Sequence, residues 1–121
     1  MTRVYIAGPM TGLPDFNYPA FNAVAACLRA RGLEAVNPAE ATPPPSGAWI
    51  DWMRLAIPQL LGCEAVMMLP GWGKSRGARI ELQIALGLGM PVSFWSEYRG
   101  SEEALPMAAS DFARAMMGAR A

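Results

Sequence analysis

A serine and a glutamate stand close together where a glycine-rich loop is predicted to lead into a helix. Residues 71–77 read GWGKSRG, and residues 78–88 carry apolar side chains at helical spacing. Backbone N–H groups at the start of a helix, with glycines that permit close approach, form a natural anion site. Ser75 can add a hydroxyl to such a site. Glu81, one turn into the helix, would then hold its carboxylate beside the bound group.

Both residues also have an ordinary structural explanation. Serine is frequent at helix N-caps, where Ser75 would simply accept a backbone N–H. Glutamate is favoured in the first turn by the helix dipole, so Glu81 could face solvent. Lys74 or Arg76 could add positive charge to an anion site, although the loop is not a Walker motif because the Gly-Lys-Ser/Thr ending is out of register. From the residues alone, the structural explanations are favoured.

A second loop, residues 8–19, follows a strand predicted at residues 3–7 and is rich in Gly, Pro, Asp and Asn. Gly8, directly after the strand, would let a ligand approach the backbone. Tyr5, within the strand, could pack in the core or reach the same site. Asp15 or Asn17 could cap the helix that follows. The polar and glycine residues of this loop are Gly8, Thr11, Gly12, Asp15 and Asn17.

Aromatic and carboxylate residues remain as the chemical tools of the chain. Trp49, Trp52 and Trp72 could stack on a planar base or fill a subunit interface. The sequence contains no histidine, which excludes Ser-His-Asp and Cys-His catalysis and histidine zinc sites. Two distant cysteines do not make a structural zinc site. Carboxylate, tyrosine and backbone groups are the usual means of glycosyl transfer or hydrolysis.

Strand-like and helical patterns alternate along the chain. Strands are predicted at residues 3–7, 33–36, 64–69 and 91–95, and helices at 20–31, 49–61, 78–88 and 105–117. Pro58 is expected to kink or divide the second helix, and Gly32 to end the first. The expected buried faces are Phe21, Val24, Ala25 and Leu28 in the first helix, Ile50, Met53, Ile57, Leu60 and Leu61 in the second, and Ile80, Ile84, Ala85 and Leu88 in the third.

This alternation predicts an α/β fold, a three-layer doubly wound parallel sheet of four to five strands in the flavodoxin or Rossmann manner. The strand at residues 64–69 is continuously apolar, as expected of a strand buried on both faces. In such sheets ligands bind beyond the carboxyl ends of the strands, where the strand order reverses. The three loops at that edge, residues 8–19, 37–47 and 70–77, are therefore the expected site.

The bulk composition narrows the class of protein. The 121 residues, 53% hydrophobic and 17% charged, suit one compact domain with a real core. Ten basic and ten acidic residues cancel, so nucleic acid is not an expected partner. No apolar run of about 18 residues and no leader pattern is present, so we expect no membrane contact and a cytoplasmic location. The apolar excess suggests surface buried in a homo-oligomer.

The residues match a known family pattern. The opening VYIAGPMTG and the segment LPGWGKSRGARIE resemble the nucleoside 2-deoxyribosyltransferase-like superfamily, and most closely an often phage-associated branch with an Asn-Pro after strand two. The resemblance covers roughly residues 3 to 95, and the tail at 96–121 lies outside it. It implies a single doubly wound domain over residues 1–121, often in dimers or larger oligomers whose neighbours complete the site.

The resemblance implies roles for particular residues. Glu81 takes the place of the catalytic glutamate, a nucleophile on the anomeric carbon or a stabiliser of the developing cation, and Tyr5 that of the tyrosine that orients it. Ser75 stands where nucleoside 5′-monophosphate N-glycosidases have a phosphate-contacting serine and transferases on free nucleosides an aspartate. With a reference pKa of about 4.3, Glu81 is expected to be ionised near neutral pH. The expected substrate- and phosphate-binding residues are Gly8, Pro9, Met10, Thr11, Gly12, Asp15, Asn37, Gly71, Trp72, Ser75 and Gly77.

The function expected from this resemblance is hydrolysis of the N-glycosidic bond of a (deoxy)nucleoside 5′-monophosphate. No metal and no cofactor are expected, and the partner is a small-molecule nucleoside or nucleotide. Two alternatives stay open: a deoxyribosyltransferase that exchanges bases, and a nucleotide-binding or signalling module without turnover. A structural or interaction protein is the remaining possibility, since fold alone does not imply function.

Overall fold

The computed structural model describes residues 2–98, so the helix expected at 105–117 lies outside the described residues. Four strands form the central sheet: β1 (Arg3–Ala7), β2 (Glu34–Val36), β3 (Ala65–Met68) and β4 (Val92–Phe94). Their order is β2-β1-β3-β4, and every neighbouring pair is parallel. The predicted doubly wound α/β class is confirmed, with four strands in the described part of the chain.

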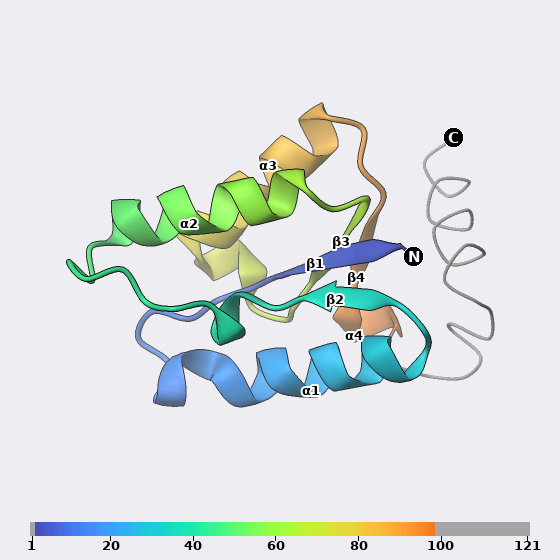
Figure 1. Ribbon diagram of the computed structural model, residues 1–121, viewed down its shortest axis with the longest axis horizontal. Helices are drawn as coiled ribbons and strands as arrows, with labels where there is room; N and C mark the ends of the chain where they lie inside the picture. The colour runs from blue at the N-terminus through green and yellow to red at the C-terminus, as the bar shows by residue number, and fades with distance from the viewer. Residues whose placement is uncertain (1, 99–121) are drawn as a thin grey trace.

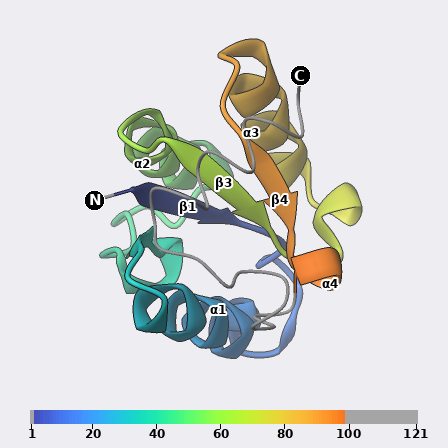
Figure 2. The same cartoon turned by 90° about the vertical axis from the view of Figure 1, so that its right-hand side faces the viewer.

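Helices cover both faces of this sheet. Helix α1 (Tyr18–Ala30) lies against one face, and α2 (Trp49–Leu61) and α3 (Arg76–Gly87) lie against the other (Figures 1 and 2). The shorter elements are η1 (Pro14–Asn17), η2 (Pro38–Glu40), η3 (Trp72–Lys74) and α4 (Trp95–Tyr98). None of the helices formed by residues 2–98 has the length and apolar character needed to cross a membrane.

Alternation along the central strands divides the core in two. Val4 and Ile6 of β1 pack with α1, whereas Tyr5 and Ala7 point to the side of α2 and α3. All four residues of β3 are buried, which confirms the prediction of a strand covered on both faces. The period of two therefore sends Tyr5 towards the helix that carries Glu81.

Helix α1 buries the face that its spacing predicts, Phe21, Val24, Ala25 and Leu28. Gly32, with φ of +82°, follows its C-cap as expected. Asn17 occupies the N-cap position of α1, as expected, but its side chain makes no capping hydrogen bond. Its backbone is left-handed, and its side-chain amide donates to the carbonyl oxygen of Pro9 at 3.0 Å, so it ties the preceding loop to the helix start.

Helix α2 runs through Pro58 undivided, so of the expected kink or division the division is wrong. Pro58 lies in the last turn, where its missing N–H removes one bond to the carbonyl of Arg54 and little helix remains to be lost. The expected buried face is also wrong in part. Leu60 is buried, but Ile50 is 47% and Leu61 55% exposed. The described elements cover only the side of α2 that faces α3 and the sheet.

Helix α3 begins two residues earlier than predicted, and the expected inward face is right only in part. Ala85 is buried as expected, together with Ala78 and Glu81, whereas Leu88 just after the helix is 60% exposed. The two alanines bring the helix close to the sheet because they add little bulk between the backbones. Glu81, spaced three and four residues from them, is carried inward on the same face.

Candidate active site

The strand order reverses between β1 and β3, and this reversal places the site. From β1 the chain goes outward to β2, then returns to β3 on the other side of β1, so the loops after β1 and β3 leave in opposite directions. The two loops begin close together, just after the ends of β1 and β3. A Cβ on Gly8 would lie 2.7 Å from the Cβ of Leu69, so only glycine allows this approach. The crevice between the loops is where a ligand is expected.

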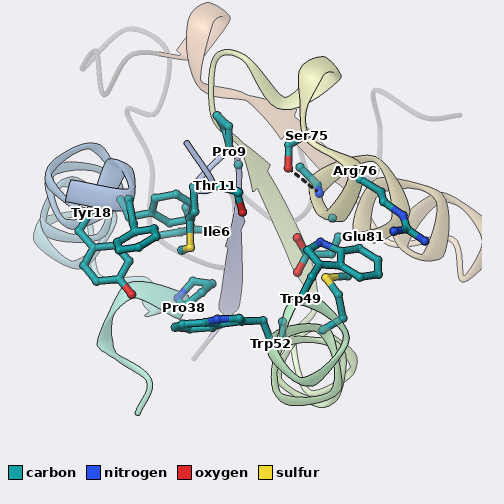
Figure 3. Close-up of a pocket in the computed structure, with 18 of the residues that line it drawn as sticks. Ile6, Pro9, Thr11, Tyr18, Pro38, Trp49, Trp52, Ser75, Arg76 and Glu81 are labelled. Atoms are coloured by element: carbon teal, nitrogen blue, oxygen red, sulfur yellow. Dashed lines mark hydrogen bonds between the residues drawn. The ribbon is translucent and has the colours of Figure 1, made fainter. Parts of the chain in front are cut away.

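A cavity of about 530 Å³ fills this crevice, within the size range of small-molecule sites. In Figure 3, Ser75, Arg76 and Glu81 lie on one side of it and Tyr18 on the other, with Trp52 below. The lining comes from the loop after β1, from α1, α2 and α3, and from the loop before α3. One cavity therefore joins segments that are far apart in the sequence.

Glu81 and Tyr5, the two residues expected to be catalytic, meet at the base of this cavity. Tyr5 is 1% and Glu81 5% exposed. The Tyr5 hydroxyl donates a hydrogen bond to Oε2 of Glu81. β1 turns Tyr5 towards α3, and the alanine face of α3 turns Glu81 towards β1. The favoured solvent-facing interpretation of Glu81 is therefore wrong.

Burial dominates the proton affinity of this pair. It raises the pKa of Glu81 from 4.5 to about 7, while the hydrogen bond from Tyr5 opposes that rise. Burial also raises the pKa of Tyr5 well above its usual value, and the neighbouring carboxylate adds to this. The expectation of an ionised Glu81 near neutral pH needs correction, because at pH 7 the carboxyl is close to half protonated. Tyr5 stays protonated and serves as the hydrogen-bond donor.

Ser75 caps α3, as its structural explanation predicts. Its Oγ accepts a hydrogen bond from the backbone N–H of Ala78 at 3.2 Å. The residue also lines the cavity. Accepting one bond does not use up a hydroxyl, which can still donate its own proton to an oxygen acceptor. Capping and ligand contact are therefore compatible at Ser75.

Gly77 brings α2 close to the first turn of α3. A Cβ at this position would lie 3.0 Å from Sδ of Met53 and 3.7 Å from Nε1 of Trp49. This close packing sets Trp49 beside the start of α3, where the guanidinium carbon of Arg76 lies 4.0 Å from the centre of the indole ring. Lys74 and Arg76 both line the cavity, so positive charge borders it on this side.

The first loop contributes Gly8, Pro9, Met10 and Thr11 to the lining, together with Ser75 and Gly77 from the loop before and the start of α3. Five other expected binding residues lie outside the lining. Asn37 is buried elsewhere: its amide donates to Oδ1 of Asn22 at 2.9 Å, and its Oδ1 accepts from Ala39 N at 3.0 Å. It shapes the turn after β2. The others are Gly12, Asp15, Gly71 and Trp72.

These four residues serve the loops themselves. Gly12 and Gly71 have φ of +83° and +86°, the left-handed conformation that glycine adopts without strain. Asp15 is exposed in η1, also with positive φ. Trp72 packs against Phe94 of β4, with ring centres 5.8 Å apart. The loop composition predicted that these residues bind the ligand. In the structure they form turns or pack against other residues.

Aromatic side chains line several sides of the cavity, and the sequence indicated only some of them. Trp49 and Trp52 were considered for stacking, and both line the cavity. Phe16 and Tyr18, with ring centres 6.0 Å apart, also line it. Their only sequence signal is the presence of aromatic residues in a loop rich in Gly and Pro. The remaining unanticipated lining residues are Ile6, Phe21, Pro38, Gly47, Met53, Ala56 and Ala78.

The cavity thus offers a ligand one buried carboxyl, several hydroxyls, two cations and a set of aromatic faces. Within residues 2–98, no three His, Cys, Asp or Glu side chains gather as a metal ion would require. A carboxylate at the closed end and flat aromatic walls suit a ligand that has an electrophilic carbon attached to a planar group.

Two solved structures share this fold. A 2-deoxyribosyltransferase from Bacillus psychrosaccharolyticus matches with a TM-score of 0.62 at 16% identity, over 77% of this chain and 71% of that one. A 2-deoxyribosyltransferase from Leishmania mexicana matches with a TM-score of 0.60 at 23% identity, over 90% and 75%. The fold that the predicted superfamily implies is therefore confirmed.

The sequence comparisons add a family. No curated protein sequence matches the chain significantly. A family model described as a domain of unknown function, DUF4406, matches residues 2–94, which include every strand of the sheet and every residue that lines the cavity. The chain belongs to the DUF4406 family.

Proposed function

We propose that the protein cleaves the N-glycosidic bond of a (deoxy)nucleoside 5′-monophosphate, with Glu81 acting at the anomeric carbon. The observation that carries this proposal is the buried pair of Tyr5 and Glu81 at the closed end of the cavity. A buried carboxylate that lines a ligand-sized cavity can reach an electrophilic carbon of a bound ligand. The related fold of two 2-deoxyribosyltransferases agrees with chemistry on nucleosides.

The proposed reaction has two steps. The carboxylate of Glu81 bonds to the anomeric carbon while the C–N bond breaks, and the electron pair leaves with the base, which takes a proton from solvent. Water then attacks the same carbon and the bond to Glu81 breaks, which gives sugar phosphate, the Glu81 carboxylate and a proton returned to solvent. Tyr5 holds Oε2, which leaves Oε1 as the attacking atom.

Aromatic walls support a nucleobase as the leaving group. Trp52 and Tyr18 line the cavity with flat faces. Stacking on such faces orients a planar base without a dedicated hydrogen-bond partner. The distribution of the side chains suits a sugar over Glu81, with the base extended towards Trp52 and Tyr18.

The groups around Ser75 at the edge of the cavity are the reason for proposing a substrate with a 5′-phosphate. The first N–H groups of α3, the hydroxyl of Ser75 and the cations of Lys74 and Arg76 all lie on this side. Groups of this kind hold phosphate in many α/β proteins. An unphosphorylated nucleoside would leave these groups unused.

Base exchange is a second candidate, favoured by the names of the two solved structures. It shares the first step, but a second base rather than water attacks the sugar on Glu81.

We further propose that the protein is a cytoplasmic homo-oligomer. Free thiols at Cys27 and Cys63 suit a reducing compartment, and exposed Ile50, Leu61 and Leu88 suit a covered surface.

The test is to incubate the protein with a panel of nucleosides and their 5′-monophosphates and to follow free base by chromatography. We expect base from monophosphates, and more slowly from nucleosides. Addition of a second free base separates the two candidates, because exchange yields a new nucleotide and hydrolysis does not. Binding of a nucleotide without base release over hours would contradict turnover of either kind.

A further inference from the structure

A stacked pair on the cavity rim, Arg76 over Trp49, has no part in the proposed chemistry at Glu81. Arg76 is the first residue of α3, and Trp49 is the first residue of α2. The guanidinium carbon lies 4.0 Å from the centre of the indole ring. Both side chains line the cavity, and Figure 3 shows them beside Glu81. The pair therefore stands within reach of a ligand that binds beside Glu81.

The charge of Arg76 is not neutralised by the described part of the protein. Within residues 2–98, Arg76 takes part in none of the ion pairs. A cation in the first turn of a helix is also opposed by the helix dipole, and α3 has no acidic residue there. A bound anion would relieve both costs.

Stacking on Trp49 fixes the plane of the guanidinium and leaves its N–H edge available. Arginine commonly stacks on an aromatic face while its edge forms paired hydrogen bonds to phosphate oxygens. The stack has its own packing device, because Gly77 allows Trp49 to approach α3. Trp49 is therefore a positioning residue for Arg76.

The spacing along α3 fits a phosphorylated sugar. Arg76 precedes Glu81 by five residues, roughly 7 Å along the helix axis at about 1.5 Å per residue. This is the scale of a pentose with its exocyclic carbon. Burial and Tyr5 account for the pKa of Glu81, and Arg76 is not among the causes of its shift. Arg76 can thus contact the ligand without altering the ionisation of the carboxyl.

We propose that Arg76, held flat by Trp49, selects phosphorylated over unphosphorylated substrate by binding the 5′-phosphate of a nucleotide whose sugar lies over Glu81. This inference rests on the proposed function and adds the residue that sets its substrate preference.

The first experiment measures kcat/KM for base release from a monophosphate and from its nucleoside, in wild type, Arg76→Met and Arg79→Met. Arg79 is the matched control, because it is an exposed cation of the same helix turn outside the cavity lining. We expect Arg76→Met to lose about 10- to 100-fold on the monophosphate, the effect of a charged hydrogen bond, and to keep the nucleoside rate and the pH profile. Equal losses on both substrates, or equal effects of the two variants, would overturn the proposal.

A second experiment separates this proposal from the proposed function. Binding of ribose 5-phosphate is followed by calorimetry, which requires no turnover. We expect a Kd about tenfold or more higher in Arg76→Met than in wild type or Arg79→Met. Unchanged binding in Arg76→Met, or no binding to wild type, would refute the role of Arg76. Absence of base release together with the expected binding differences would refute only the glycosidase.

Trp49 is tested by a conservative pair of variants. Trp49→Phe keeps an aromatic face under the guanidinium, whereas Trp49→Leu removes it. We expect the phenylalanine variant to retain most of the preference for monophosphate and the leucine variant to lose it through KM. Equal behaviour of the two variants would show that Trp49 acts only by filling space.

Discussion

At the scale of single residues, one hydrogen bond and its burial set the chemistry. Glu81 lies among apolar groups and alanines, so its carboxyl holds a proton up to about pH 7, and the hydrogen bond from Tyr5 favours the charged form. Attack on an anomeric carbon requires the ionised carboxylate, so a pKa near 7 sets the pH above which Glu81 can act. This balance determines how the activity and the stability of the protein change with pH.

Replacement of Tyr5 by phenylalanine removes the bond that lowers the pKa of Glu81 and leaves the burial that raises it. A hydrogen bond worth about 1 kcal/mol corresponds to a shift of about 0.7 pH unit. We expect kcat/KM to rise with pH through a midpoint near 7 in wild type, and at a higher pH in Tyr5→Phe. Tyr18→Phe, also on the cavity lining, is the control and should keep the wild-type midpoint. A lower midpoint in Tyr5→Phe would contradict the assignment.

The raised pKa of Glu81 also makes the fold sensitive to pH. Below pH 4.5 the carboxyl is protonated in both states; between 4.5 and about 7 it ionises only in the unfolded chain, which lowers stability. A rise of about 2.5 units costs wild type about 3 kcal/mol by pH 8. We expect Glu81→Gln to unfold at higher urea than wild type at pH 8, with little difference near pH 4.

An exposed glutamate gives the opposite sign. Arg29 lowers the pKa of Glu40 through a hydrogen bond. Glu40→Gln should therefore be less stable than wild type at neutral pH and about as stable as wild type in acid. Urea unfolding of both variants at several pH values checks the pair. A stability difference between wild type and Glu81→Gln that does not change with pH would contradict the buried, protonated carboxyl.

At the scale of elements, the segments that follow β1 and β3 approach each other closely at Gly8 and Leu69, beside the crevice. Gly8→Ala would set a Cβ 2.7 Å from the Cβ of Leu69, a buried atom near the backbone that cannot move cheaply. We expect a loss of about 1–3 kcal/mol in the free energy of unfolding, as for an overpacked core. Gly73→Ala, with open space around its Cβ, should be nearly neutral. Equal effects in chemical denaturation would contradict this packing.

The elements also show what the sequence pattern could predict. The apolar periods place the strands and helices within a few residues because hydrophobic spacing reports the local period. They fail on α2 and α3, where the pattern does not say how much partner surface is available. Ile50 and Leu61 have no described cover, and the small Ala78 and Ala85 form the buried face of α3. Spacing of Glu81 with these alanines was the signal for its burial.

At the scale of the whole molecule, the parallel sheet followed from the alternation of strands and helices, whereas the place of its reversal, between β1 and β3, is given by the structure alone. The lining of the cavity followed only in part. The loops after β1 and β3 contribute residues to it, but Asn37 and Trp72 turn away from the cavity, and Phe16 and Tyr18 turn towards it. Those orientations depend on tertiary contacts made by residues distant in sequence, which local patterns do not encode.

Large apolar side chains remain on the outside of the described domain. Leu61, Leu86 and Leu88 are each more than half exposed. If these residues are buried in a homo-oligomer, sedimentation of the full chain should give a multiple of 13.0 kDa. Leu86→Lys should shift the distribution towards the monomer, whereas an exposed polar control, Gln83→Lys, should not. A monomeric wild type at high concentration would contradict oligomerisation.

The central claim is that Glu81 cleaves a glycosidic bond. Its most direct test is chromatographic detection of free base after incubation of nucleoside monophosphates with wild type and with Glu81→Gln, at matched folded concentration. We expect base release by wild type and its loss by a factor of about 10³ or more in the variant, since a covalent nucleophile is removed, with ribose 5-phosphate binding retained. Base release by Glu81→Gln at the wild-type rate would contradict the account.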